Sequence, residues 1–265
     1  MWPVEYIGVP IAALTMLLAQ RMEARIGAAA AGWVAALPIA FGVASATIAV
    51  TQNHTDASLI ALSAAGHVAP MAAYAIAFVW LTTRLGAVRG FLLATLVYVA
   101  ASVSVIPVPE VARIVIGVLA IFLGGLYMAR QPRAIRTGEA PTRMQRVLSL
   151  GSAALVVAFI TVANQYSGPG LAGAIGAFPT MSTTIALFIA HRSGVRNANS
   201  VMGGMVKSLP IYLTYCLVFA LLILHTKAWW AVAGATALAL VAAMLTWTRV
   251  ERADITENGV LYAEP

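Results

Sequence analysis

The chain has 265 residues, of which 61% are hydrophobic and only 9% are charged, and its net charge is +7. Because soluble domains carry roughly 25% charged residues, this composition excludes a water-soluble globule. The apolar runs are unbroken and lack the alternation of an outer-membrane barrel, which leaves a polytopic helical membrane protein. The basic residues are clustered between apolar runs, so they indicate membrane orientation and argue against a nucleic-acid partner.

The apolar segments predict nine membrane-spanning helices, each near the roughly 20 residues that one crossing requires. In chain order the predicted spans are 4–20, 27–50, 57–82, 87–106, 109–129, 146–165, 170–190, 204–224 and 228–248. A basic loop at 130–146 separates the fifth span from the sixth, and a polar tail at 249–265 follows the ninth. The spans are rich in Ala and Gly, which let membrane helices pack closely.

The distribution of Lys and Arg predicts the orientation of these spans. If the 130–146 loop faces the cytoplasm, alternation of nine spans places most other basic residues on the same side: Arg21, Arg25, Arg84, Arg89, Arg192, Arg196, Arg249 and Arg252. The opposite side receives only Arg113 and Lys227. By the positive-inside rule we expect an integral protein of a bacterial inner membrane, with its N-terminus outside and its C-terminus in the cytoplasm.

Two segments of the chain resemble each other at a spacing of about 140 residues. Residues 32–38 and 173–179 both begin with glycine and end with a bulky apolar residue followed by proline. Residues 67–70 and 207–210 each place an ionisable residue three positions before a proline, and Tyr74 and Tyr215 follow at similar distances. Features that recur in the same order at a nearly constant spacing indicate an internal repeat.

The repeat predicts an all-α architecture with two inverted copies of four helices. The first copy covers 1–106, the fifth span and the basic loop connect the copies over 107–145, and the second copy covers 146–248. Because an odd number of crossings separates equivalent spans, the second copy is inverted relative to the first. Secondary transporters use this arrangement, since exchanging the conformations of the two halves opens the site to alternate sides of the membrane.

Prolines inside the predicted second and seventh spans indicate where a solute would bind. Pro38 and Pro179 each remove a backbone donor, and the carbonyls that they free must face protein, polar side chains or water. Hydroxyls follow both prolines, so we expect a small polar site between the broken helices. These hydroxyls belong to Ser45, Thr47, Thr180, Ser182 and Thr183. Kinks that serve packing alone are the competing interpretation.

His67 and Lys207 are ionisable residues within the predicted third and eighth spans. A lysine at the centre of a membrane helix costs roughly 2.5–3.5 kcal/mol, so such residues usually serve a function. His67 would bind solute or carry a proton, because imidazole titrates near physiological pH. Lys207 would attract an anionic solute, although its long side chain could also reach the membrane surface. Away from the ends of the predicted spans there is no carboxylate, which favours an anionic or zwitterionic solute.

These features predict a secondary transporter of a small solute, with a proton or sodium as a possible coupling ion and no cofactor. Its expected partners are the solute and the lipid bilayer.

A passive channel is one alternative, because it needs a polar path but no alternating gates. A soft-metal transporter is another, since the imidazole of His67 and nearby thioethers would suit Cu(I). Those thioethers belong to Met71, Met181, Met202 and Met205. Motifs such as HExxH, GxSxG and the Walker loop are missing from the sequence, so no enzyme is predicted.

Overall fold

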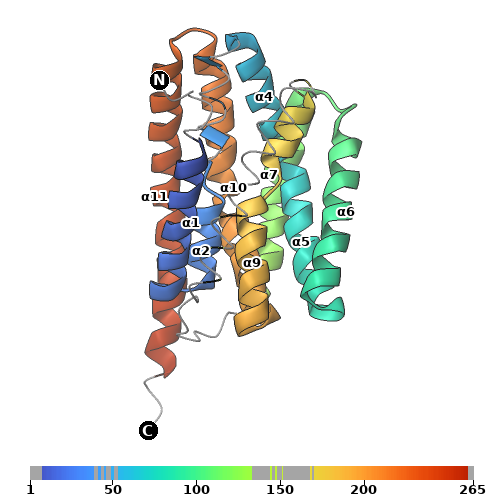
Figure 1. The fold of residues 1–265 in the computed structure, drawn as a ribbon, viewed down its shortest axis with the longest axis vertical. Coiled ribbons are helices and arrows are strands. Elements are labelled where there is room, and N and C mark those ends of the chain that lie inside the picture. The colour runs from blue at the N-terminus through green and yellow to red at the C-terminus, as the bar shows by residue number, and fades with distance from the viewer. Residues whose placement is uncertain are drawn as a thin grey trace.

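The computed structural model describes residues 8–38, 53–132 and 170–261, together with a few single positions between these ranges. These described residues form helices and no strands (Figure 1). Six of their helical stretches are long and apolar enough to cross a membrane, as expected of an integral membrane protein. They are His54–Leu85, Ala87–Val105, Glu110–Ala129, Gly170–Ser193, Val195–Ile223 and Ala228–Leu245.

The six stretches coincide with the predicted spans 3, 4, 5, 7, 8 and 9. Predicted span 1 overlaps α1 (Gly8–Arg25), which continues five residues beyond it through a charged segment that includes Glu23. Predicted span 2 is described as α2 (Ala28–Ala35) and single positions beyond it. Predicted span 6 and the loop at 130–146 lie almost entirely outside the described residues. The count of nine spans therefore stays a prediction.

The predicted third span consists of two helices, α4 (His54–Gly66) and α5 (Val68–Leu85), which meet at His67. The side chain of Asn53 caps α4 by accepting the backbone N–H of Asp56 at 2.7 Å. Pro70 has no N–H to donate to the carbonyl of Gly66, so the regular helix is interrupted between them. The interruption places the backbone of His67 at the junction, with φ −93° and ψ 9°.

The remaining described helices are α6 (Ala87–Val105), α7 (Glu110–Ala129), α9 (Thr180–Ser193), α10 (Val195–Ile223) and α11 (Ala228–Leu261). The predicted eighth span began at 204, but α10 begins nine residues earlier and continues through Pro210. Gly194 precedes α10 with φ 86°, a conformation that favours glycine. The predicted tail at 249–265 overlaps the end of α11, which continues as a helix to Leu261.

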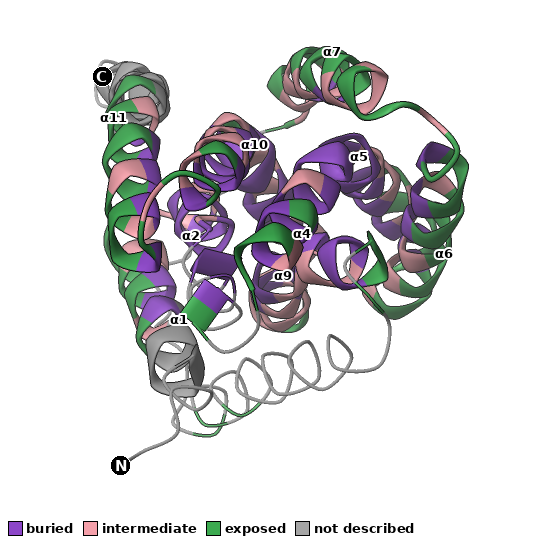
Figure 2. Ribbon diagram, turned by 90° about the horizontal axis from the view of Figure 1, so that it is seen from above, coloured by how far each residue is buried: buried purple, intermediate pink, exposed green. Residues whose placement is uncertain are grey.

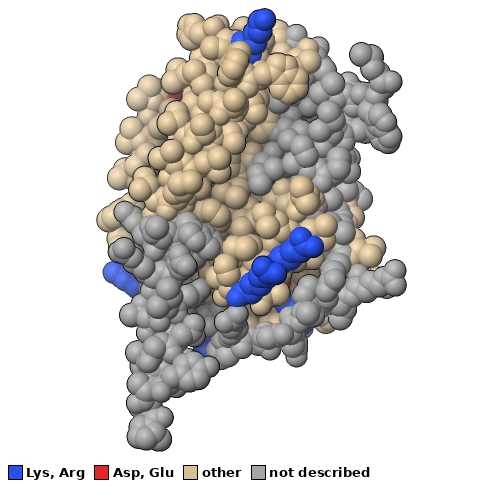
Figure 3. All heavy atoms as spheres, turned by 90° about the vertical axis from the view of Figure 1, so that its left-hand side faces the viewer, with Lys and Arg blue, Asp and Glu red and all other residues tan. Residues whose placement is uncertain are grey.

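The buried core lies along α10, which contacts α2, α4, α5, α7, α9 and α11. Figure 2 shows buried residues concentrated on α2, α4, α5 and α10, whereas α6, α7 and α11 expose their outer faces. Phe122 of α7 and Trp229 of α11 are 64% and 72% exposed. Apolar outer faces of this kind suit contact with lipid. On the face drawn in Figure 3, Lys and Arg lie in the lower part and at the upper end, with other residues between them.

Candidate functional site

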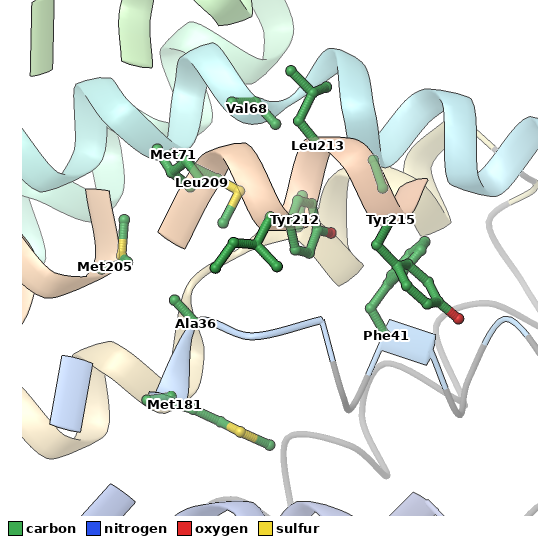
Figure 4. Close-up of a cluster of buried hydrophobic side chains, with 14 of the residues drawn as sticks. Ala36, Phe41, Val68, Met71, Met181, Met205, Leu209, Tyr212, Leu213 and Tyr215 are labelled. Atoms are coloured by element: carbon green, nitrogen blue, oxygen red, sulfur yellow. The ribbon is translucent and has the colours of Figure 1, made fainter. Parts of the chain in front are cut away.

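Two helix interruptions adjoin the buried core. Helix α2 ends at Ala35, and the chain then turns through Pro38. The second stretch is helical over 170–177, is interrupted at Phe178 and Pro179, and resumes as α9. Ala36 and Met181, which flank the two interruptions, belong to one buried cluster (Figure 4). Since α2 and α9 also contact each other, the fold brings the two interruptions together.

The segment around the first interruption packs on α10 along a contact that we call the first seam. The first seam consists of Ala29, Gly32 and Gly42 against Gly204, Val201 and Tyr215. A Cβ atom at Gly32 would overlap the carbonyl oxygen of Val201, and one at Gly204 would overlap that of Ala29. A Cβ atom at Gly42 would lie 2.8 Å from the hydroxyl oxygen of Tyr215. Glycine therefore allows this segment and α10 to approach at backbone distance.

The segment around the second interruption packs on α4 and α5 along a contact that we call the second seam. The second seam consists of Gly170, Gly173 and Thr183 against Ser63, Ile60 and Tyr74. A Cβ atom at Gly173 would lie 2.7 Å from the carbonyl oxygen of Ile60. The hydroxyl of Ser63 donates to the carbonyl of Gly170 at 2.7 Å. The second seam is thus less close than the first, and it includes hydrogen bonds.

The second hydrogen bond of this seam joins the hydroxyls of Tyr74 and Thr183, 2.8 Å apart. Thr183 also donates to the carbonyl oxygen of Pro179 at 2.8 Å. A hydroxyl has one hydrogen to donate, so Tyr74 is the donor to Thr183. The proline interruption and the tyrosine are therefore linked through one threonine.

Aromatic rings flank both seams. The ring of Phe178 lies 5.4 Å from that of Tyr74 and 5.0 Å from that of Tyr98. The hydroxyl of Tyr98 donates to the carbonyl of Ala174 at 2.6 Å. Beside the first seam, the ring of Phe41 lies 5.7 Å from that of Tyr212 and 6.4 Å from that of Tyr215. Tyrosines of neighbouring helices therefore pack beside each interruption, from α5 and α6 at the second and from α10 at the first.

Several buried polar atoms have no hydrogen-bond partner in the described part of the chain. They include Nε2 of His67 and the hydroxyls of Ser102, Ser182, Tyr212 and Tyr215. Folded proteins leave few such atoms, and each one calls for an explanation. A bound solute or a changed conformation would satisfy them.

His67 is buried at the junction of α4 and α5. Its Nδ1 lies 2.7 Å from the carbonyl oxygen of Ser63, which can only accept, so Nδ1 carries the hydrogen. The neutral ring therefore keeps a lone pair on Nε2 that is able to accept a proton or a hydrogen bond. Sequence reasoning did not place Arg113 here, yet its side chain packs against Gly66. The Arg113 guanidinium donates to the carbonyl of Val108 at 2.6 Å.

Lys207 and His67, the two ionisable residues predicted for the site, have different environments. Lys207 is exposed on α10, whereas His67 is 2% exposed. The next residue, Ser208, is fully buried and donates to the carbonyl of Met205 at 2.7 Å. Lys207 is therefore exposed, unlike the buried residues of the two seams.

The predicted hydroxyls lie close to the interruptions. Thr180 donates to the carbonyl of Phe178 at 3.1 Å, and Ser45 donates to the carbonyl of Gly42 at 3.0 Å. Ser182 is buried, and Thr47 lies outside the described residues. The methionines that suggested a soft metal, Met71, Met181, Met202 and Met205, are all buried. Figure 4 shows three of them around the cluster that includes Tyr212.

Polar side chains also connect distant parts of the chain at one end of the helices. Glu23, near the end of α1, forms an ion pair with Arg192 of α9. Burial raises the pKa of the Glu23 carboxyl, and the adjacent guanidinium offsets part of that increase. Asn199 of α10 accepts from Thr82 at 3.0 Å and donates to Thr83 at 3.0 Å. These contacts lie at the lower end of the view in Figure 1, where α9 joins α10.

Sequence reasoning noted Tyr74 and Tyr215 as repeat markers but did not assign them to the site. A usable signal was present, because Tyr74 and Phe78 recur as Tyr215 and Phe219 at an offset of 141 positions. Tyr212, one turn earlier on α10, carries no such signal. No family model matches the chain, and no curated protein or solved structure is significantly similar to it. Functional inference therefore depends on the residues themselves.

Proposed function

We propose that the chain is a secondary transporter of a small solute, working by alternating access between two inverted four-helix repeats. The solute site lies between the interruptions at Pro38 and Pro179. In this proposal nine helices span a bacterial inner membrane, with the N-terminus outside and the C-terminus in the cytoplasm. His67 accepts the coupling proton at Nε2. Lys207, which is exposed on α10, attracts the solute.

The reciprocity of the two seams is the observation that carries this proposal. The same shift of 141 positions relates Gly32–Val201 to Gly173–Ile60, Ala29–Gly204 to Gly170–Ser63, and Gly42–Tyr215 to Thr183–Tyr74. In each pair the residue from one half of the chain contacts a residue from the other half. A chance resemblance in an Ala-rich chain gives no reason for three tertiary contacts to share one offset, whereas a duplicated structural unit does.

A further pair of contacts supports inversion of the repeats. The hydroxyl of Ser58 donates to the carbonyl of Ala220 near the end of α10, at 2.9 Å. Asn199, near the start of α10, pairs with Thr82. Positions 58 and 199 again differ by 141, whereas their partners at 82 and 220 differ by 138. In Figure 1, α5 leads down to its junction with α6 while α10 leads up to its junction with α11. Opposite directions for equivalent helices are what inversion requires.

Alternating access follows from exchanging the two seams. The second seam is held by hydrogen bonds from Ser63 and Tyr74, whereas the first seam meets through glycine. If the repeats exchange conformations, each seam adopts the spacing now found in the other, so the first seam loosens while the second closes. In this proposal, the ion pair between Glu23 and Arg192 helps to close one end of the path. Exchange breaks that ion pair and opens this end to solute.

Transport in proteoliposomes tests the proposal. We expect uptake of a radiolabelled solute, chosen from those that raise the melting temperature, to saturate and to show counterflow. Flux that rises linearly with concentration at channel rates would instead establish a passive channel. A His67→Ala variant that folds should lose the pH dependence of uptake, because it lacks Nε2. Unchanged pH dependence would remove the assigned role of His67.

Topology can be tested separately with single introduced cysteines. Asp56→Cys and Arg136→Cys should react with a membrane-impermeant maleimide from opposite sides. Reaction of both from one side would contradict the nine-span orientation and the inversion. The transporter proposal would then lose its two-repeat mechanism.

A further inference from the structure

The two seams differ in the partner that each gives to its tyrosine. In the second seam, the hydroxyl of Tyr74 donates to Thr183. The position equivalent to Thr183 in the first seam is Gly42, which has no side chain. Among the described residues, the hydroxyl of Tyr215 consequently has no hydrogen-bond partner. One tyrosine of the pair is thus satisfied within the protein and the other is not.

Tyr212 adds a second unpaired hydroxyl one turn earlier on α10. Its hydroxyl also has no partner in the described part of the chain, and Tyr212 and Tyr215 are only 4% and 3% exposed. Ser45 lies near Tyr215 and Cys216 lies near Tyr212, but neither forms a hydrogen bond with the tyrosine in this conformation. Ser45 donates its hydrogen to the carbonyl of Gly42. Two buried donors beside one helix interruption have given up hydration without gaining a bond within the protein. A ligand that accepts hydrogen bonds would restore both.

Most of the described side chains around these hydroxyls are apolar or aromatic. Figure 4 shows Tyr212 and Tyr215 with Phe41, Leu209 and Met205 in one buried cluster. The polar side chains buried in the described part of the chain are hydroxyls, amides and His67, and they include no Asp, Glu, Lys or Arg. A charged solute placed here would lack a buried counter-charge, which makes its desolvation costly. A neutral solute with an apolar face meets no such penalty.

We propose that Tyr212 and Tyr215 donate hydrogen bonds to a small, electrically neutral solute whose apolar face packs on Phe41 and Leu209. This inference rests on the proposed transport function and names the substrate class of the same site. It departs from the anionic class that His67 and Lys207 predicted, because Lys207 is exposed. The satisfied Tyr74 holds the second seam together, while its unsatisfied counterpart binds solute.

A set of four probes of similar size tests the substrate class. Benzamide is neutral and accepts hydrogen bonds, toluene is neutral without an acceptor, benzoate is an anion and benzylammonium is a cation. We expect benzamide to raise the melting temperature of the purified protein more than the other three. A larger effect of benzoate or benzylammonium would overturn the neutral class, and so would the absence of any benzamide effect.

Removing single hydroxyls tests the two donors. Tyr212→Phe and Tyr215→Phe should each weaken benzamide binding about tenfold, as expected for one lost hydrogen bond. Their melting temperatures without ligand should be unchanged or higher, because each variant removes an unpaired buried hydroxyl. Tyr74→Phe is the matched control, since it removes a paired hydroxyl. It should lower the melting temperature and leave benzamide binding intact.

The outcomes separate this inference from the proposed function. If Tyr212→Phe and Tyr215→Phe lower the melting temperature as much as Tyr74→Phe, these hydroxyls serve folding and the inference is wrong. If both bind benzamide like wild type, the inference is also wrong. If benzamide binds through these tyrosines but shows no counterflow in proteoliposomes, the site stands and the transporter proposal fails.

Discussion

The first and second seams join equivalent backbone segments, yet they differ in how closely the segments approach and in chemistry. The three contacts of the first seam are close approaches of glycine to a carbonyl or a phenol. In the second seam, Ser63 and Tyr74 contribute hydrogen bonds at 2.7 and 2.8 Å. Hydrogen bonds are directional, whereas glycine contacts permit sliding along the helix. One scaffold thus supplies both a contact held by hydrogen bonds and a closer contact that depends on glycine.

The largest effect should come from adding a methyl group to the first seam. Gly204→Ala places a Cβ atom on the carbonyl oxygen of Ala29, and because that atom is backbone it cannot turn aside. We expect a loss of about 3 kcal/mol in unfolding free energy, seen as a lower melting temperature. Gly125→Ala on α7 is the control, because no atom lies within 4 Å of its new Cβ. Equal stability of the two variants would contradict the close approach.

A double substitution tests the contact between Gly42 and the hydroxyl of Tyr215, which distinguishes the first seam from the second. Gly42→Ala brings a Cβ atom to 2.8 Å from the Tyr215 hydroxyl oxygen, so it should cost about 1–2 kcal/mol. Adding Tyr215→Phe removes that oxygen and should recover at least part of the loss. Thermal melts of both single variants and the double variant give the coupling free energy. Strict additivity would show that the two residues do not meet.

Removing a hydrogen bond should make the second seam more like the first. Ser63→Ala loses the bond to the carbonyl of Gly170, so we expect about 1 kcal/mol lower stability in thermal melts. Ser104→Ala is the control, because the exposed Ser104 bonds only within its own helix. If Ser63→Ala behaves like Ser104→Ala, the second seam is not held by this bond.

The smallest effect should come from the ion pair outside both seams. Burial raises the pKa of Glu23 in the folded protein, so folding favours its protonated form. The resulting stabilisation is complete below the pKa of the unfolded carboxyl and disappears as the pH rises through the raised value. Between pH about 7 and about 4 the wild type should therefore gain melting temperature relative to Glu23→Gln. The opposite trend would mean that Arg192 dominates over burial.

The membrane class and the positions of many helices could be predicted from the sequence because they depend on local apolar runs. The prediction of 87–106 matches α6 to one residue at its C-terminal end, since Gly86 and Pro107 bound a mostly apolar run. The start of α10 was missed because polar residues resemble a loop. Asn197 and Asn199 are helical there because their side chains form hydrogen bonds. The Asn197 amide donates to the carbonyl of Ser193, and the Asn199 amide oxygen accepts from the hydroxyl of Thr82.

The site was harder to predict, because helical side chains change direction with every residue. Matching Pro70 to Pro210 gave an offset of 140 and paired His67 with Lys207, whereas the seam contacts follow an offset of 141. That offset pairs His67 with the buried Ser208. One residue rotates a helical position by about 100°, enough to exchange a buried side chain for an exposed one. The tertiary contacts that reveal the correct offset are not visible in the sequence.

Cys216 follows Tyr215 on α10 and has no exposed surface in this conformation. It is the single cysteine of the chain, so it is a natural reporter beside the first seam. In the conformation described here it should resist thiol reagents, and cysteines introduced elsewhere should label without background. A conformation that separates the first seam would admit the reagent to its sulfur. The rate of Cys216 alkylation therefore measures how often the protein leaves this state.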